Sequence, residues 1–267
     1  MSPPVVVPLD VEQPKTRLSP VLGPDERRAF ALSMARDVLA AVRGAGLDPV
    51  VLATGPVPAD LDAPVVRDDR PLTDAVDAAV SAAFDGSGTD GADPEATDAG
   101  PDDPGATDPA ATGEAVGHRA PGSGLPGGST GAAWDGAGVD LEAPIAVVMA
   151  DLALATPATV TRLVETPGDV VLVPGRGGGT NAFVARVSGF RVDYHGVSYR
   201  DHRRAAERVG ASVGTVDSHR LSTDVDEPAD LVEVLLHGEG TAADWLRDAG
   251  FEVVVDQREG RVRVARS

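Results

Sequence analysis

Short apolar runs rich in β-branched residues alternate with segments of helical periodicity along this chain. The run "PVVVPL" (4–9) predicts a buried strand, because a continuous apolar run bounded by prolines fits a strand covered on both faces. A helix start at Pro24 is followed by apolar residues at helical spacing as far as Gly44. This repeated order predicts an α/β protein with a mostly parallel mixed sheet and helices on both faces.

Later segments follow the same order. Further strands are expected at 50–54, 64–66, 144–151, 169–174 and 211–216. Further helices are expected at 72–84, 158–166, 198–210, 227–238 and 241–250. A terminal hairpin is expected at 251–265, with its turn at Glu259 and Gly260. Ligands bind such sheets at the carboxyl ends of the strands, near a switch in strand order. A site is therefore expected where residues 9–17, Asp151 and residues 175–181 meet.

Residues 85–142 interrupt this pattern. These 58 residues hold 14 Gly, 6 Pro and 12 Asp or Glu but one Arg. Such a segment cannot bury enough apolar surface to offset the entropy lost on ordering. We therefore predict a disordered acidic insertion within a single domain.

Composition excludes several classes of function. A net charge of −19 repels polyanions, so binding to nucleic acid or to an anionic membrane is not expected. The acidic chain, with one lysine, resembles proteins of salt-loving organisms, where salt screens self-repulsion. With no cysteine there is no disulfide and no thiolate metal site. No signal-peptide pattern or long apolar run is present, so a cytoplasmic location is expected.

The only lysine, Lys15, follows the first predicted strand and lies two positions before Arg17. These two cations can hold a triphosphate, with arginine forking onto two oxygens and lysine acting as a point charge. The alternative is a solvated loop. A Walker A element is excluded, because its glycines are missing before Lys15.

Three aspartates are candidate magnesium ligands. Asp151 follows a predicted strand, and Mg²⁺ prefers one or two carboxylates together with phosphate oxygens. Asp151 could instead cap the next turn. Asp224 and Asp226 alternate on an extended segment, so at most one is expected to share a metal with Asp151 unless a bend intervenes. The alternative is that this acidic cluster, with Pro228 and Asp230, only starts the next helix.

Two further segments offer polar groups. In "GRGGGTN" (175–181) the glycines let the backbone approach an anion, with Thr180 and Asn181 as added donors; the alternative is a flexible turn. The segment "YHGVSYRDH" (194–202) carries Ser198 between two histidines. Ser198 can simply cap a helix, and both His195 and His202 can be surface residues.

Five motifs occur in a fixed order, and together they resemble a known family. They are "VPLDVEQPKTRLSPVLGPDERRAFALSMARDVL", "ADL" at 150–152, "VPGRGGGTNAFV", "GVSYRDH" and "DVDEPADL". In that order they resemble the 2-phospho-L-lactate guanylyltransferases (CofC family) of coenzyme F(420) biosynthesis, in a haloarchaeal form. The resemblance covers about residues 3–84 and 144–237.

The resemblance implies a GT-A-like nucleotidyltransferase fold that joins GTP to 2-phospho-L-lactate with Mg²⁺. It further implies lactyl-2-diphospho-5'-guanosine and pyrophosphate as products, a next-step transferase that takes the product, and a homodimer. In this reading 1–84 is the nucleotide-binding part, 143–240 binds the metal and the phosphorylated acid, and 241–267 is a C-terminal extension.

Roles for single residues also follow from the resemblance. It implies that the catalytic residues are Lys15, Arg17 and Asp151, and that the nucleotide is bound by Leu9, Lys15, Arg17 and Thr73. It implies that the phosphorylated acid is bound by Gly179, Thr180, Asn181, His195, Gly196 and Ser198. The implied metal ligands are Asp151 and Asp226, with Asp226 preferred to Asp224.

Departures from the family pattern leave alternatives open. Pro71, Leu72 and Thr73 stand where the family often has "GLN", Gly196 and Ser198 are two apart instead of three, and Ala153 replaces a proline.

Relatives use phosphoenolpyruvate or 3-phosphoglycerate. A sugar-phosphate or molybdenum-cofactor nucleotidyltransferase is disfavoured, because no glycine follows the first strand. A non-catalytic nucleotide-binding protein of the same fold is the remaining alternative.

Overall fold

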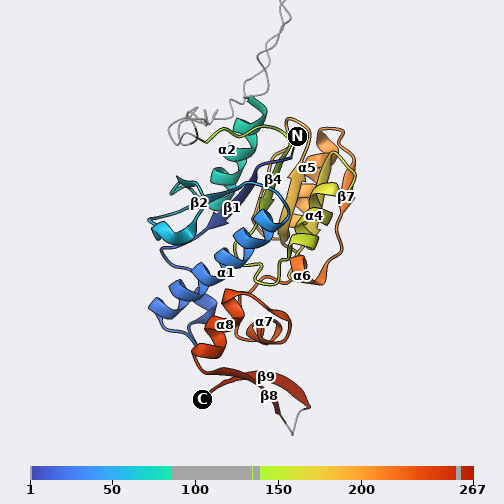
Figure 1. Ribbon diagram of the computed structural model, residues 1–267. Helices are drawn as coiled ribbons and strands as arrows, with labels where there is room; N and C mark the ends of the chain where they lie inside the picture. The colour runs from blue at the N-terminus through green and yellow to red at the C-terminus, as the bar shows by residue number, and fades with distance from the viewer. Residues whose placement is uncertain (1, 86–133, 135–138, 257–259) are drawn as a thin grey trace, which may run out of the picture. The chain divides into compact units, whose positions relative to one another are not determined.

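A seven-stranded sheet in the order β3-β2-β1-β4-β6-β5-β7 forms the centre of the computed structural model (Figure 1). Its strands are β1 (Val5–Leu9), β2 (Pro49–Ala53), β3 (Val65–Arg67), β4 (Ile145–Val148), β5 (Val170–Pro174), β6 (Thr180–Ala185) and β7 (Val213–Thr215). Strand β6 runs antiparallel to β4 and β5, and the other pairings are parallel. The structure describes residues 2–85, 134, 139–256 and 260–267. The expected mostly parallel mixed sheet is confirmed.

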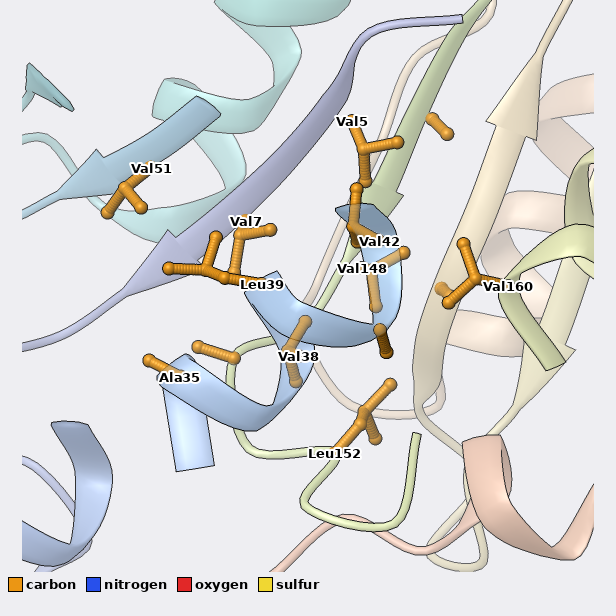
Figure 2. Packing of buried hydrophobic residues seen from close by; sticks show 14 of the residues in the cluster. Val5, Val7, Ala35, Val38, Leu39, Val42, Val51, Val148, Leu152 and Val160 are labelled. Carbon is orange, nitrogen blue, oxygen red and sulfur yellow. The ribbon is translucent and has the colours of Figure 1, made fainter. Parts of the chain in front are cut away.

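Helices cover both faces of the sheet. Helices α1 (Pro24–Gly44) and α4 (Pro157–Glu165) pack on one face, and α2 (Leu72–Asp85) and α5 (Ser198–Arg208) on the other. The alternation of side chains along β1 explains this, since Val5 and Val7 point to α1 while Val6 points to the opposite face. Figure 2 shows Val5 and Val7 beside Val38, Leu39 and Val42 of α1.

The C-terminal segment adds a second apolar cluster against α1. It contains the short helices α6 (His219–Ser222), α7 (Leu231–His237) and α8 (Thr241–Asp248), followed by strands β8 (Phe251–Asp256) and β9 (Arg261–Arg266). Phe30 of α1 packs there with Leu231, Leu246 and Phe251. The predicted hairpin is confirmed by the antiparallel pairing of β8 and β9, although Glu259 of its turn lies outside the described residues.

Helix α7 begins at Leu231, later than the predicted 227. The reason is a turn closed by Asp230, whose Oδ2 accepts hydrogen bonds from the backbone N–H of Asp226 (3.0 Å) and of Glu227 (2.8 Å). Two short 3-10 helices, η1 (Thr16–Leu18) and η2 (Ala59–Leu61), complete the described elements.

Most of the predicted insertion, 86–133 and 135–138, lies outside the described residues. Its predicted boundaries were too wide, however, because Asp85 ends α2 and two residues near the other end are buried. Trp134 is 3% exposed and Leu141 is 6% exposed, and both pack in the core cluster beneath α2 and α5. None of the helices in the described ranges has the length and apolar character needed to cross a lipid bilayer.

Candidate active site

The strand order switches between β1 and β4, since β2 pairs with the other side of β1. At this point a cavity of about 490 Å³ opens at the carboxyl ends of the strands. Its lining includes Leu9, Asp10, Lys15, Arg17, Thr54, Asp68, Arg70, Leu72, Asp151 and Asp226. The cavity thus brings together the loop after β1 and Asp151, as the strand-end rule predicted, but residues 175–181 are not among its lining residues.

Lys15 forms the centre of this site. Its Nζ donates to Asp151 Oδ2 at 2.5 Å and to Asp226 Oδ1 at 2.8 Å, and only 12% of the side chain is exposed. Burial works against the charged form, but the two carboxylates outweigh it and raise the pKa of Lys15 above its ordinary value. Lys15 is thus a buried, charged ammonium, and the solvated-loop alternative is wrong for this residue.

A tight loop aims Lys15 at the carboxylates. Lys15 has a left-handed backbone (φ 52°) directly before η1. Upstream, Asp10 Oδ1 accepts hydrogen bonds from the backbone N–H of Glu12 (3.0 Å) and from the Thr54 hydroxyl (3.1 Å). The loop after β1 is therefore fixed to the end of β2 before it reaches Lys15.

Arg17 differs from Lys15 in exposure. Its side chain is 69% exposed, and its Nη1 lies 3.4 Å from Asp226 Oδ2. Such a surface pair contributes little to stability. Arg17 therefore lines the cavity as a cation free to turn toward an anionic ligand.

The carboxylates next to Lys15 fit a divalent cation. Asp151 Oδ1 is buried and has no hydrogen-bond partner among the described residues, while its Oδ2 binds Lys15. A buried carboxylate oxygen without a partner is costly unless a ligand satisfies it. Oxygen donors of this kind suit Mg²⁺, so Asp151 and Asp226 are the residues that could hold it.

Asp224 faces another direction than Asp226. Its Oδ1 accepts a hydrogen bond from Asn181 Nδ2 at 3.1 Å. Burial raises the pKa of Asp224 above its ordinary value, and the nearby Asp151 and Asp226 act in the same direction. The expected alternation is thus present, with Asp226 turned to Lys15 and Asp224 turned to Asn181.

The glycine loop joins β5 to β6 as a hairpin at the same edge of the sheet. At Gly175 a Cβ atom would lie within van der Waals overlap of the Asn181 side chain, and Gly178 has a left-handed backbone (φ 85°). Arg176 pairs with Asp230 at 2.5 Å, which ties this loop to the segment that carries Asp226.

Thr180 and Ser198 are brought together. The backbone N–H of Thr180 donates to Ser198 Oγ at 2.9 Å, and both residues are buried. Gly179 lies against the same serine, since a Cβ atom there would be 3.9 Å from Ser198 Oγ. The structure therefore brings together three residues of the predicted acid-binding set, Gly179, Thr180 and Ser198.

His202 contacts Thr180 of this pair and is fully buried, so the alternative of a surface residue is wrong for this histidine. Its Nε2 accepts from the backbone N–H of Asp193 (2.8 Å), and Nδ1 lies 2.9 Å from Thr180 Oγ1. Burial lowers the pKa of His202 to about 4, so the ring is neutral near pH 7. A neutral ring that accepts at Nε2 must donate from Nδ1 to the Thr180 oxygen.

The remaining predicted residues lie in different surroundings. Leu9 lines the cavity. Thr73 is not among the lining residues, because its hydroxyl accepts from the backbone N–H of Tyr194 at 3.0 Å. His195 is exposed and contacts Asp193, and Gly196 has a left-handed backbone (φ 62°).

Asp68 and Arg70 were missed by sequence reasoning. They follow β3 and line the cavity. Arg70 donates two hydrogen bonds to the Asp68 carboxylate, from Nε to Oδ1 at 2.8 Å and from Nη2 to Oδ2 at 2.5 Å. These bonds hold the pKa of Asp68 below its ordinary value. The strand-end rule, applied to β3 as well as β1, would have found both.

Comparison with solved structures first defines the class of fold. The chain is similar to a putative nucleotide-diphospho-sugar transferase from Desulfovibrio desulfuricans G20, with a TM-score of 0.58 and 16% identity over 93% of this chain and 95% of that chain. At this identity the likeness shows the fold alone, which agrees with the expected nucleotidyltransferase type.

Comparison of sequences then gives the family. The model of the family "Guanylyl transferase CofC like" matches residues 4–85 and 136–267, and the chain belongs to this family. It is 48% identical to the 2-phospho-L-lactate guanylyltransferase of Halomicrobium mukohataei over 98% of both chains. It is likewise 48% identical to the enzyme of that name from Halorubrum lacusprofundi, over 98% of this chain and 99% of the other.

Proposed function

We propose that this protein is a guanylyltransferase that joins GTP to 2-phospho-L-lactate, giving lactyl-2-diphospho-5'-guanosine and pyrophosphate for coenzyme F(420) biosynthesis. The names of its relatives support this activity. The observation that carries it is the buried Lys15 ammonium between Asp151 and Asp226 in the lining of the cavity. That arrangement provides charge for a triphosphate and oxygen ligands for a metal.

The nucleotide would lie across the ends of β1, β2 and β3. In this placement Lys15 and the exposed Arg17 neutralise the triphosphate, one as a point charge and one as a fork. Leu9 offers an apolar surface to the nucleoside. Asp68 and Arg70, at the β3 end of the cavity, are the candidates for contact with the base.

The phosphorylated acid would bind between the glycine loop and the start of α5. Gly179, Thr180 and Ser198 converge there. His202 donates to the Thr180 oxygen, which leaves the hydroxyl hydrogen of Thr180 for another acceptor. We assign His202 as a positioning residue that orients this hydroxyl.

The chemistry needs alignment and neutralised charge more than proton transfer. The phosphate of the acid is already an anion, so it can attack the α-phosphorus of GTP without a general base, and pyrophosphate leaves. Lys15 and Arg17 offset the charge that gathers on the leaving group. Asp151 and Asp226 would hold Mg²⁺, which supplies further charge neutralisation when bound. A homodimer and a next-step transferase that takes the product stay predictions.

A substrate panel tests this function. Purified protein in high KCl with Mg²⁺ is given GTP, ATP, CTP or UTP with 2-phospholactate, phosphoenolpyruvate or 3-phosphoglycerate, and pyrophosphate is measured. We expect the fastest release with GTP and 2-phospholactate. Faster release with another acid would assign a different acceptor, and GTP binding without pyrophosphate release from any pair would show a non-catalytic protein.

A further inference from the structure

A second group of metal-ligating side chains lies outside the cavity. His219 begins α6, and Glu233 and His237 lie one helical turn apart on α7. Their ligand atoms all lie within 4.8 Å of one another. None of these three residues lines the cavity or takes part in the proposed reaction.

The distances in this group are close to those of a bound metal. A single oxygen, Glu233 Oε2, lies 3.4 Å from His219 Nε2 and 3.7 Å from His237 Nε2. Ligand atoms about 2.0–2.1 Å from a tetrahedral zinc ion are roughly 3.4 Å apart. Small side-chain rotations would therefore bring all three atoms to bonding distance of one ion.

The side chains are also accessible and well placed to converge. The side chains of His219 and His237 are 56% and 49% exposed, and their rings meet edge to face with centroids 5.5 Å apart. Arg220 braces the two helices by donating to the His237 carbonyl oxygen at 3.2 Å. A metal could thus enter from solvent and keep an open fourth position for water.

The ligand types select the metal. Two imidazoles and one carboxylate suit Zn²⁺ and similar first-row ions, whereas Mg²⁺ prefers oxygen ligands only. This group therefore differs in chemistry from Asp151 and Asp226, whose donors are all oxygens.

The position of the group gives binding a consequence. His219 precedes, and Glu233 and His237 follow, the segment 223–230 that carries Asp224 and Asp226. We propose that His219, Glu233 and His237 form a site for Zn²⁺ or a similar ion that clamps α6 to α7 and thereby restrains this segment. Closing a loop at both ends reduces its conformational freedom.

Calorimetric titration of untagged, chelator-treated full-length protein with Zn²⁺ tests the site. We expect one ion per chain at this site, unaffected by excess Mg²⁺, and binding at least about tenfold weaker in His219→Gln and in His237→Gln. Hydrogen exchange at residues 223–230 should slow on addition of Zn²⁺ in the wild type and not in these variants. Matched thermal midpoints without metal would show that the variants fold.

Two control variants separate this site from other ligands. His195→Gln removes an exposed histidine that also contacts a carboxylate, Asp193, and should bind Zn²⁺ like the wild type. Asp226→Asn removes a predicted magnesium ligand and should do the same. Wild-type affinity in the His219 and His237 variants, or a loss as large in either control, would overturn the proposal.

Discussion

Lys15 donates a 2.5 Å hydrogen bond to Asp151, which lies 136 positions further along the chain. The bond joins the loop after β1 to the loop after β4, the two strands that flank the switch in strand order. Because both groups are largely buried, each charge depends on the other for its stability. The pair is therefore charged, largely buried and part of the cavity lining.

Two single substitutions, Lys15→Arg and Arg17→Lys, distinguish the roles of the two cations. Lys15→Arg should lower turnover about 100-fold, because a planar guanidinium does not fit between two carboxylates spaced for an ammonium. Arg17→Lys, at an exposed position, should have a smaller effect. Steady-state pyrophosphate release measures both, and unchanged kinetics in Lys15→Arg would make the lysine incidental.

The two candidate second ligands can be told apart by magnesium dependence. Asp226→Asn should raise the Mg²⁺ concentration for half-maximal activity about tenfold or more. The reason is that Asp226 lies beside Asp151, since both carboxylates accept a hydrogen bond from Lys15 Nζ. Asp224→Asn should raise it less, since Asp224 faces Asn181. A larger shift in Asp224→Asn than in Asp226→Asn would reverse the assignment.

His202 should make stability fall in mild acid. Its folded-state pKa of about 4 is below the ordinary value of 6.5, so the unfolded chain takes up a proton that the folded chain excludes. This contribution is complete above about pH 6.5 and is lost as the pH falls toward 4. Between about pH 7 and pH 5 the wild type should lose about 2 kcal/mol more unfolding free energy than His202→Gln.

Denaturant unfolding at both pH values, in constant KCl, measures this difference. The comparison uses the pH-dependent change within each protein, so the lower overall stability of the variant does not enter. An equal loss in both proteins would show that His202 does not titrate in this range.

Trp134 should be a core residue despite its place inside the predicted insertion. Trp134→Ala should lower the free energy of unfolding by about 3 kcal/mol or more, because it leaves a large cavity. Trp134→Phe should cost less, since the indole Nε1 has no hydrogen-bond partner among the described residues. Thermal or denaturant unfolding checks this, and a wild-type midpoint in Trp134→Ala would place the residue outside the core.

The main features of the fold and part of the site could be predicted from the sequence. Strand runs followed by helices fix which ends of the strands share an edge, and this alone brings Lys15 near Asp151. The direction of Asp226 could not be predicted, because it depends on the turn that Asp230 closes. Extended spacing indicates only that neighbouring carboxylates diverge.

The burial of His202 and Trp134 also could not be predicted from the sequence pattern. His202 lies in a segment rich in arginine, yet it packs near the rings of Phe183, Phe190 and Tyr194. Trp134 is a lone large residue in a Gly-rich, acidic stretch. In both cases distant parts of the chain supply the apolar surroundings, and local composition does not report them.

The most direct test of the account compares pyrophosphate release by wild type and Asp151→Asn with GTP, 2-phospholactate and saturating Mg²⁺. Asp217→Asn, at an exposed position, is the matched control, and thermal midpoints show whether each variant folds. We expect a loss of about 100-fold or more in Asp151→Asn and wild-type release in Asp217→Asn. Wild-type release from a folded Asp151→Asn protein would contradict the assignment of this carboxylate to the reaction.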